Sequence, residues 1–462
     1  MMEECPVERR GFFKRSAAGG ALIGAAAGIA NSPPVSAEGW RQETRVRENG
    51  KYDILLKGGH VIDPANNVNA GMDVAVADGR IALVGAGIPE KDAKKTIDVS
   101  GFYVSPGFID IHFHGYYTFQ KDGGVRNYII PNDHCFKSGV TTCVDAGSSG
   151  GDNFKDFMEI IEASRTRVLA FLNIARGGMR ASSEQDPRQY DIRLAVDTAR
   201  NNSKVIVGFK VAHYWTTRPY DELHTPWANV DAAEEAGRKA DLPVMFDWYP
   251  RPASGGYPMR SYRELILEKS RPGDIHTHHY AIHIPVIGSD GKVNPDVFKA
   301  KERGFIFDCG HGEGSFVWRN AIPAIQQGFV SNSISTDLHR GNTNGPVMTM
   351  IHVMSKYLSM GVPLEEVIRL STINPAREIN HLELGTLSVG GIADIAVFEQ
   401  QEGNFSYLDT SGGKLWGTKR LYNVMTLSGG EVVFDPSALS YPLWENIPKD
   451  ARYWVNPSGQ YF

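Results

Sequence analysis

The chain has 462 residues, of which 22% are charged, and its formal net charge is −5 at pH 7. A chain of this length exceeds one small hydrophobic core, so one large barrel or two domains are expected. The mild negative charge, and the lack of any Lys/Arg cluster beyond the N-terminus, argue against nucleic acid as a partner.

The N-terminus carries the pattern of an export signal. Arg9 and Arg10 precede a weakly apolar stretch, residues 17–30, which is followed by Val35-Ser36-Ala37. A charged start, an apolar middle and a small-x-small end are typical of a secretory signal, and the paired arginines resemble the bacterial twin-arginine signal. We therefore expect residues 1–37 to be removed and the mature protein to be periplasmic or secreted. A disordered tail or a membrane anchor is the alternative.

The cysteines indicate neither a disulfide framework nor a thiolate zinc site, because they are scattered without C-x-x-C spacing. They are Cys5, Cys135, Cys143 and Cys309. Removal of the signal would leave three of them, which we expect to be free buried thiols.

Both ends of the mature chain show short strand patterns separated by tight turns. Residues 52–104 contain several such runs, and Asp78-Gly79 is a two-residue hairpin signal. Similar runs recur between residues 384 and 434. We expect residues 38–105 and 383–435 to form one β-sandwich domain from both terminal segments, with residues 436–462 as a C-terminal tail.

The middle of the chain, residues 106–382, alternates between strand and helix patterns, which is typical of an α/β fold with a TIM (β/α)8 barrel. Helix patterns occupy Phe154–Ser164, Asp191–Asn201, Ala232–Ala240 and Val347–Met360. The expected strands are Phe108–Phe113, Thr141–Asp145, Arg167–Asn173, Val205–Val211, Pro243–Asp247, Asp274–Tyr280, Gly304–Asp308 and Ser333–Asp337. In such barrels the chemistry lies at the carboxyl ends of the strands.

Ionisable residues occur at those strand ends. His112 and His114 leave the same face of the first strand, so they can converge on one metal ion or form a hydrogen-bonded pair. Lys210 lies inside an apolar strand, where an unpaired ammonium is costly. It therefore either pairs with a carboxylate or reacts with carbon dioxide to give an anionic carbamate ligand. The later strand ends carry Asp247, His276, His278, His311 and Asp337, and alternation groups His276 with His278 and puts His279 opposite.

The run from Pro106 to His114, closing a short β module and followed by Lys, His and Asp at strand ends, resembles the amidohydrolase superfamily of metallohydrolases. Four further segments are similar to its amidohydrolase/deacetylase subgroup, which is related to dihydroorotases and D-aminoacylases. These segments are residues 139–148, 208–211, 272–278 and 310–316.

The resemblance implies one or two divalent ions, with zinc expected. His112, His114 and Asp337 would hold the first ion, while carbamylated Lys210 would bridge to a second ion bound by His278. Asp337 would also act as general acid and base, and His311 would bind substrate. The family pattern has a histidine where this chain has Asp247. Either Asp247 binds the second metal through oxygen, or that site is weak or empty, or the chain is inactive.

These expectations indicate a metal-dependent hydrolase that cleaves an amide or ester of a small acylated carboxylic acid. A cyclic-amide hydrolase and a catalytically decayed periplasmic binding protein are the alternatives. We expect no membrane partner after signal removal, and homo-oligomerisation is left open. Arginines and aromatics of the strand-end loops could hold a carboxylate and cover an apolar group. They are Tyr116, Tyr117, Arg176, Arg180, Trp215, Arg218, Trp248, Tyr249, Arg251 and Arg340.

Overall fold

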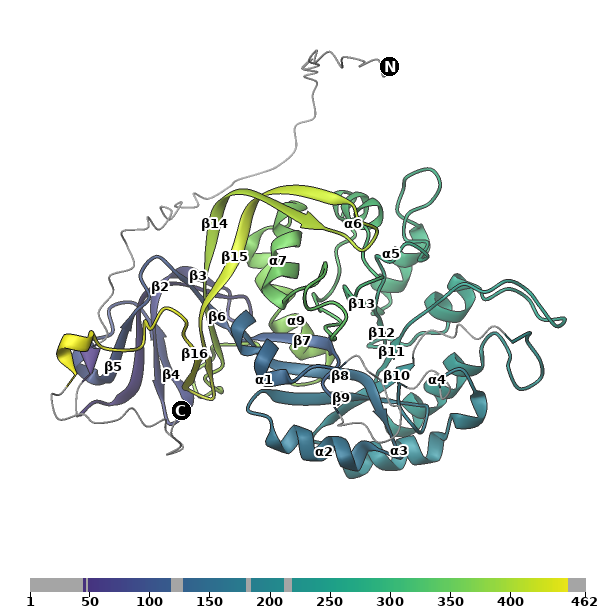
Figure 1. Ribbon diagram of the computed structural model, residues 1–462, viewed down its shortest axis with the longest axis horizontal. Helices are drawn as coiled ribbons and strands as arrows, with labels where there is room; N and C mark the ends of the chain where they lie inside the picture. Colours follow the sequence, from purple (N-terminus) through teal and green to yellow (C-terminus); the bar gives the residue numbers. More distant parts are fainter. Residues whose placement is uncertain (1–44, 47–48, 118–127, 180–183, 212–217, 448–462) are drawn as a thin grey trace, which may run out of the picture. The chain divides into compact units, whose positions relative to one another are not determined.

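Two β-sheets organise the protein in this computed structural model, which describes residues 45–46, 49–117, 128–179, 184–211 and 218–447 (Figure 1). The predicted signal peptide and residues 448–462 of the predicted tail lie outside these ranges. The described residues all belong to one compact unit, residues 34–462.

The first sheet combines strands from both ends of the chain. Its nine strands follow the order β1-β5-β2-β6-β14-β15-β16, with β3 paired to β2 and β4 paired to β3. The pairing of β6 with β14 joins the two ends, and Val104 lies opposite Val397. The structure thus describes one sheet where we expected one β domain, and its packing as a sandwich stays a prediction. The strands are β1 (Arg45–Val46), β2 (Tyr52–Asp63), β3 (Val68–Ala77), β4 (Arg80–Gly85), β5 (Ala93–Asp98), β6 (Tyr103–Pro106), β14 (Ile395–Leu408), β15 (Lys414–Ser428) and β16 (Glu431–Phe434).

The predicted hairpin between β3 and β4 is confirmed. Ala77 pairs with Arg80, and the two residues between them, Asp78 and Gly79, have φ values of 50° and 72°. Two consecutive positive φ values match the twist of the flanking strands, and Asp-Gly tolerates them better than most dipeptides.

The second sheet is parallel and has seven strands in the order β13-β12-β11-β10-β9-β8-β7. Strands β7, β9 and β10 agree closely with the predicted ones, whereas β8 continues five residues beyond its predicted end at Asp145. The last two are much shorter than predicted, because the chain leaves the extended conformation at His278 and Gly310, whose φ values are 63° and 46°. The strands are β7 (Phe108–Phe113), β8 (Val140–Gly150), β9 (Arg167–Asn173), β10 (Ile206–Val211), β11 (Val244–Phe246), β12 (Ile275–His276) and β13 (Ile306–Phe307).

The predicted eighth strand, Ser333–Asp337, is not a regular strand. This segment nevertheless lies between the two edges of the parallel sheet, because Ser333 bridges Asp308 and Leu338 bridges Phe113. The backbone N–H of Asp337 also donates to the carbonyl of His112 at 2.6 Å. The sheet is therefore curled so that its first and last strands contact one segment, while closure into a complete barrel stays a prediction.

Helices follow most strands of the parallel sheet and cover its outer side (Figure 1). Alternate strand residues such as Val168 and Ala170 pack toward the helices, whereas Leu169 and Phe171 belong to a separate inner cluster. This alternation is the period-2 pattern of a sheet buried on both faces. The helices are α1 (Pro131–His134), α2 (Phe154–Ala163), α3 (Ile192–Asn201), α4 (Ala228–Ala240), α5 (Pro295–Glu302), α6 (Trp318–Gln326), α7 (Met350–Ser359), α8 (Leu364–Arg369) and α9 (Ile373–Glu378).

Strands β14 and β15 extend beyond the sheet as a long hairpin that packs against α7 (Figure 1). The hydroxyl of Ser355 on α7 accepts a hydrogen bond from the backbone of Leu421 at 2.9 Å. The sequence did not predict this extension, because residues 399–406 are largely polar and show no strand alternation. Contact with the helix stabilises strand structure that the local sequence does not specify.

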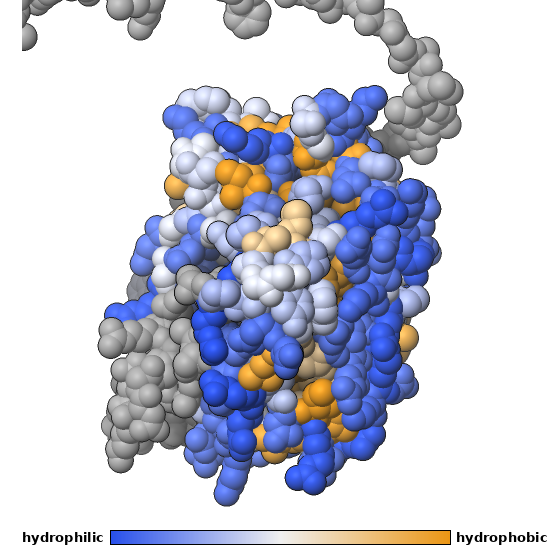
Figure 2. All heavy atoms as spheres, turned by 90° about the vertical axis from the view of Figure 1, so that its right-hand side faces the viewer, coloured by the Kyte–Doolittle hydropathy of each residue, from blue (hydrophilic) through white to orange (hydrophobic). Residues whose placement is uncertain are grey.

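The face of the molecule on the α4 side is largely hydrophilic, with small separate hydrophobic areas (Figure 2). Among the described residues, no helix combines the length and the apolar character that crossing a lipid bilayer requires.

Candidate metal centre

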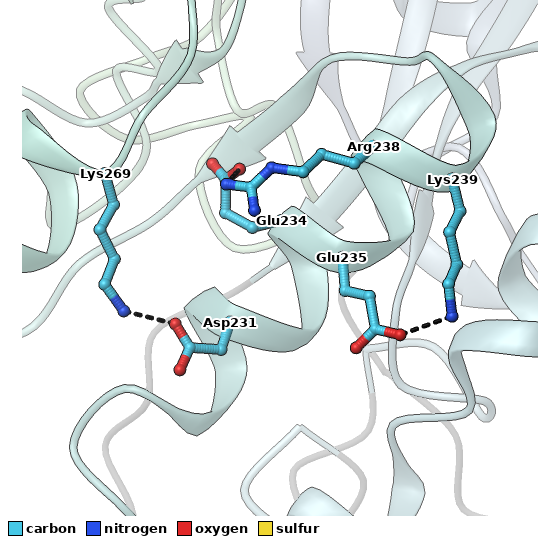
Figure 3. A pocket seen from close by; sticks show the side chains of 6 residues that line it. All are labelled: Asp231, Glu234, Glu235, Arg238, Lys239 and Lys269. Atoms are coloured by element: carbon cyan, nitrogen blue, oxygen red, sulfur yellow. Dashed lines mark hydrogen bonds and ion pairs between the residues drawn. The ribbon is translucent and has the colours of Figure 1, made fainter.

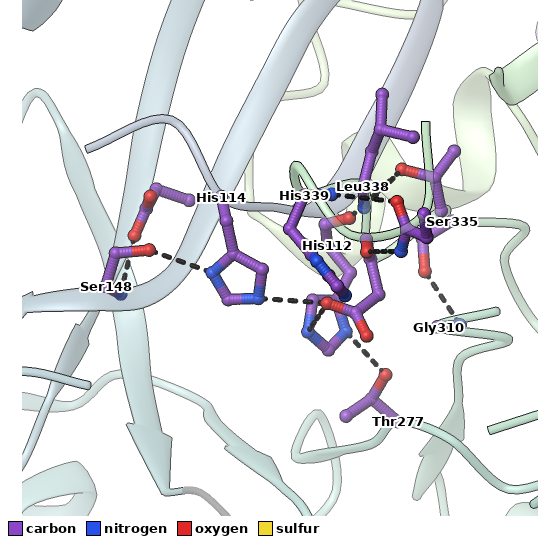
Figure 4. Close-up of polar contacts among 12 residues, drawn as sticks. His112, His114, Ser148, Thr277, Gly310, Ser335, Leu338 and His339 are labelled. Atoms are coloured by element: carbon purple, nitrogen blue, oxygen red, sulfur yellow. Dashed lines mark hydrogen bonds and ion pairs between the residues drawn. The ribbon is translucent and has the colours of Figure 1, made fainter. Parts of the chain in front are cut away.

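Two histidines at the end of β7 face one carboxylate (Figure 4). His112 places Nδ1 2.7 Å from the hydroxyl of Thr277 and Nε2 3.5 Å from Oδ1 of Asp337. His114 places Nδ1 2.8 Å from the hydroxyl of Ser148 and Nε2 2.9 Å from the same Oδ1 atom. The two imidazoles of the H-x-H pair therefore present equivalent nitrogens to Asp337.

A third imidazole reaches this carboxylate from the end of β12. His278 donates through Nδ1 to the carbonyl of Gly310, at 2.5 Å. Its Nε2 atom lies 3.8 Å from Oδ2 of Asp337 and 3.5 Å from Oδ2 of Asp247. Possible ligand atoms of His112, His278 and Asp337 all lie within 4.8 Å of one another.

The predicted grouping of His276 with His278 by strand alternation is wrong. The strand ends at His276, and the positive φ of His278 turns its side chain independently of the strand. The ring of His276 instead lies among aromatic rings, with its centroid 5.4 Å from Tyr262 and 5.9 Å from Phe307. Burial in this environment lowers the pKa of His276 to about 3.

Lys210 is buried within β10, and its side chain is 1% exposed. Its Nζ atom has no hydrogen-bond partner, and no ion pair joins it to Asp247 among the described residues. Burial lowers the pKa of Lys210 below its usual value, although the charges of Asp247 and Asp337 raise it. The sequence left two states open for Lys210, an ion pair with a carboxylate or a carbamate. The structure shows no ion pair between Lys210 and Asp247.

The carboxylate of Asp337 lies between the three imidazoles of the centre. Its backbone has a φ of 50°, and Asn342 holds its carbonyl through a 2.7 Å hydrogen bond. Burial would raise the pKa of Asp337, but the hydrogen bond from His114 and the charge of His278 lower it below its usual value. The carboxylate therefore stays ionised in the neutral range.

The glycines of the Gly310–Gly312 turn allow the close approach of these groups. A Cβ atom on Gly310 would overlap the hydroxyl of Thr277 and lie 2.7 Å from Nδ1 of His278. A Cβ atom on Gly312 would lie 2.5 Å from Oδ2 of Asp337. Both glycines also have positive φ values, so no other residue type fits either position without strain.

His311 lies beside the centre in sequence, but its ring points elsewhere. Nδ1 lies 2.9 Å from the carbonyl of Gly312, and Nε2 lies 2.7 Å from Nζ of Lys356. The ring is fully buried and stacks on Phe316, with a centroid distance of 4.4 Å. The predicted substrate-binding role of His311 therefore stays a prediction, with both ring nitrogens occupied by protein groups.

The arginines and aromatics of the strand-end loops, which were predicted to contact substrate, differ in their contacts with the rest of the protein. Arg176 is exposed and binds Asp152 through two hydrogen bonds of 2.7 and 2.9 Å. The guanidinium of Arg251 lies 4.8 Å from the ring centroid of Tyr220. Nη1 of Arg251 is buried and has no hydrogen-bond partner among the described residues. Arg180 and Trp215 lie outside the described residues.

A pocket of about 600 Å³ lies beside α4 (Figure 3). Its acidic residues are paired with basic neighbours, for example Asp231 with Lys269 and Glu235 with Lys239, both at 2.5 Å. It shares no residue with the histidine cluster. Its full lining is Asp231, Glu234, Glu235, Arg238, Lys239 and Lys269.

The donors of the histidine cluster fit a divalent metal ion. Each of the three imidazoles uses Nδ1 for a protein hydrogen bond and turns Nε2 toward a carboxylate. Nitrogen and carboxylate oxygen donors on several rigid elements are the ligands that zinc and its neighbours prefer. The buried amine of Lys210 adds a further group, which lacks a hydrogen-bond partner within the part of the chain that the structure describes.

Sequence reasoning missed the hydroxyl groups that contact the histidines. Thr277 is placed by the short strand β12, and Ser148 lies near the end of the long strand β8. The position of Thr277 between two histidines was a signal that could have been used. No comparable signal marked Ser148, because β8 had been expected to end at Asp145.

Comparison with known proteins assigns the family. The amidohydrolase family profile matches residues 317–433. The chain is 35% identical over 356 residues to deacetylase Atu3266 of Agrobacterium fabrum, which covers 75% of this chain and 82% of the relative. The chain belongs to the amidohydrolase superfamily. The predicted family resemblance is thereby confirmed, and this amidohydrolase is a hydrolase of amide bonds.

Solved structures agree with this assignment. An adenine deaminase superposes on 83% of this amidohydrolase with a TM-score of 0.73 and 28% identity, over the whole of that chain. A dihydroorotase superposes on 83% of it with a TM-score of 0.68 and 30% identity, over 99% of that chain.

Proposed function

We propose that this amidohydrolase is a metal-dependent deacetylase or aminoacylase that hydrolyses an amide or ester of a small acylated carboxylic acid. One observation carries the proposal. Three imidazole Nε2 atoms from β7 and the end of β12 face the single carboxylate of Asp337, beside a buried lysine whose amine has no hydrogen-bond partner among the described residues. A purely structural cluster would not need three imidazoles turned the same way.

In this proposal His112, His114 and Asp337 hold the first divalent ion, with zinc as the expected metal. His278, Asp247 and a carbamate on Lys210 hold the second. Nε2 of His278 lies 3.5 Å from Oδ2 of Asp247, and this short distance supports binding of one ion by both residues. When bound, the metal supplies an acidified water and polarises the substrate carbonyl.

Residues of the chain then transfer the protons of the reaction. Asp337 accepts a proton at its carboxylate from the attacking water and returns it to the leaving nitrogen or oxygen. His114 supports the accepting role, because its hydrogen bond lowers the pKa of Asp337 and keeps the carboxylate ionised. A positioned acid–base group of this kind contributes roughly 10²- to 10⁴-fold to the rate.

The proposed substrate class rests on the relative and on Arg251. The relative named deacetylase suggests removal of a small acyl group. Arg251 follows β11 in the chain, five residues after its last residue, and its Nη1 atom has no hydrogen-bond partner within the described residues. Guanidinium groups hold carboxylates through paired hydrogen bonds. Hydrolysis of a cyclic amide is the second candidate, which the similarity to a dihydroorotase favours.

A panel of substrates tests the proposal. Purified protein is loaded with zinc and assayed on N-acetyl amino acids, acetate esters, cyclic amides such as dihydroorotate, and adenine. We expect the highest kcat/KM on an N-acetylated carboxylic acid. A preference for uncharged or cationic compounds would contradict the substrate class, and a preference for cyclic amides would favour the second candidate.

Metal analysis tests the site itself. We expect at least one zinc ion per chain, and a native mass about 44 Da above that of the protein and metal, because carbamate formation on Lys210 adds one carbon dioxide. The Lys210→Met variant should lack that mass. Protein that retains no divalent metal after dialysis would contradict the proposal and favour a binding protein on a decayed hydrolase fold.

Two finer proposals accompany this function. The segment Ser333–Asp337 closes the parallel sheet into a complete (β/α)8 barrel, which its bridges to both edges support. The twin-arginine motif directs the chain to the periplasm, and sequencing the N-terminus of the exported protein tests cleavage after Ala37.

A further inference from the structure

The hydroxyl group of Thr277 connects a histidine of the centre to a buried carboxylate. Its Oγ1 atom lies 2.7 Å from Nδ1 of His112 and 2.9 Å from Oδ2 of Asp308. Asp308 is fully buried and also accepts hydrogen bonds from the hydroxyls of Ser333 and Ser335, at 2.8 and 2.6 Å. Burial raises the pKa of Asp308, and the hydrogen bonds from the three hydroxyls oppose that shift because they favour the ionised carboxylate.

A second hydroxyl supports the neighbouring histidine. The hydroxyl of Ser148 lies 2.8 Å from Nδ1 of His114, and the backbone N–H of Ser148 donates to the buried carboxylate of Asp145 at 2.8 Å. Asp145 further accepts backbone N–H groups from Gly115 at 2.9 Å and from Tyr116 at 3.2 Å. Both members of the H-x-H pair therefore contact a hydroxyl through Nδ1, and the hydroxyl of Thr277 in turn donates to the carboxylate of Asp308.

The number of protons on each group fixes which atom donates in the hydrogen bonds between imidazole, hydroxyl and carboxylate. A hydroxyl group has one proton to donate, and an ionised carboxylate can only accept. Thr277 therefore donates to Asp308, so its oxygen accepts from the Nδ1–H group of His112. In a neutral His112 imidazole the remaining nitrogen, Nε2, then carries the lone pair, and it lies 3.5 Å from Oδ1 of Asp337. His114 differs, because its Nε2 lies 2.9 Å from the same oxygen and donates to it, so its contact with Ser148 fixes the ring orientation and not the tautomer.

We propose that Thr277 and Ser148 are positioning residues that hold the rings of His112 and His114 through Nδ1, and that Thr277 also fixes the Nδ1–H tautomer of His112, so that both Nε2 atoms point to the metal position. The metal part of this inference rests on the proposed function, whereas the tautomer part does not. Removing the hydroxyl of Thr277 uncouples His112 from Asp308, and removing the hydroxyl of Ser148 leaves the ring of His114 without its contact at Nδ1. Metal binding must then select one tautomer and one ring orientation from a mixture, which weakens it.

Two matched pairs of variants test this role through zinc affinity. Thr277→Val removes the hydroxyl at nearly constant shape, and Thr277→Ser keeps it. Ser148→Ala removes the second hydroxyl, and Ser149→Ala is its control, because the buried hydroxyl of Ser149 has no hydrogen-bond partner among the described residues. Competition with a chromophoric chelator measures the affinity. We expect Thr277→Val and Ser148→Ala each to weaken zinc binding roughly 10- to 100-fold, with both controls close to wild type.

A direct readout of the tautomers separates this inference from the proposed function. In metal-free protein labelled with ¹⁵N-histidine, long-range proton–nitrogen NMR spectra distinguish Nδ1–H from Nε2–H rings. We expect Thr277→Val to convert one ring from a pure Nδ1–H pattern to a mixture, with no change in Thr277→Ser. If wild-type protein binds no zinc, the proposed function fails, and these spectra still decide whether Thr277 fixes the tautomer of His112.

The inference is overturned if Thr277→Val and Ser148→Ala match their controls in both zinc affinity and histidine spectra. If Thr277→Val does not fold, the Ser148→Ala and Ser149→Ala pair decides the question, because it removes smaller groups. A loss of zinc affinity in Ser149→Ala equal to that in Ser148→Ala would also overturn it, since packing alone would then explain the effect.

Discussion

Replacing Gly312 with alanine should displace the carboxylate of Asp337 without removing any functional group. The added Cβ atom would lie 2.5 Å from Oδ2 of Asp337, whereas ordinary contacts begin at 3.4 Å, so the groups must separate by 0.9 Å. A misplacement of about 1 Å costs roughly 100-fold in rate. The φ of 53° adds roughly 1–2 kcal/mol of strain for a residue with a Cβ atom. We therefore expect a loss of about 100-fold in kcat and a modest loss of stability.

The assay compares Gly312→Ala with Gly314→Ala, which changes the same loop. A Cβ atom on Gly314 would meet no atom of the described structure within 4 Å. Steady-state hydrolysis of the best substrate gives kcat and KM for both variants, and urea unfolding at the same pH gives their stabilities. Equal kcat values for the two variants, in folded protein, would refute the argument that the position of Asp337 limits turnover.

Three further predictions concern single side chains. Asp337→Asn should lower kcat by roughly 10²- to 10⁴-fold while bound zinc, measured by elemental analysis, is largely retained; near-normal turnover would mean that another base acts. Burial and the charge of Asp308 raise the pKa of Glu378 to about 8, so folded protein holds a proton that the unfolded chain loses near pH 4.5. Unfolding free energy should therefore fall by up to about 1.4 kcal/mol per pH unit from pH 4.5 to 8, a slope that Glu378→Gln should reduce in urea titrations. Lys356→Met should cost roughly 1–3 kcal/mol in urea unfolding, because the buried Nε2 atom of His311 and two part-buried carbonyls lose their donor. A loss below about 0.5 kcal/mol would contradict this.

The sequence predicted the parts of the fold that local patterns specify. The apolar runs that became β7 and β9 were identified to the residue, and the Asp78-Gly79 turn was identified from its chemistry. The course of the chain around His278 could not be predicted. Its positive φ depends on the close approach of Gly310, which no local periodicity encodes.

The candidate site also has parts that the sequence predicted and parts that it did not. His112, His114 and Asp337 were expected to converge because they end strands of one parallel sheet, and the structure brings them within 3.5 Å. The orientation of His311 toward Lys356 could not be foreseen, because Lys356 comes from α7, far along the chain. Thr277 and Ser148 were missed because a hydroxyl in a strand is usually unremarkable. The role of Thr277 depends on Asp308, which follows a different strand, β13.

The pairing of β6 with β14 constrains how the protein can be made. Val104 and Val397 lie opposite each other, although roughly 290 residues separate them. During synthesis on the ribosome, the early strands β2 to β6 emerge long before their partners exist, so one side of their sheet stays unpaired until translation is nearly complete. A nascent chain halted before residue 395 should therefore expose an edge that chaperones or neighbouring chains can bind.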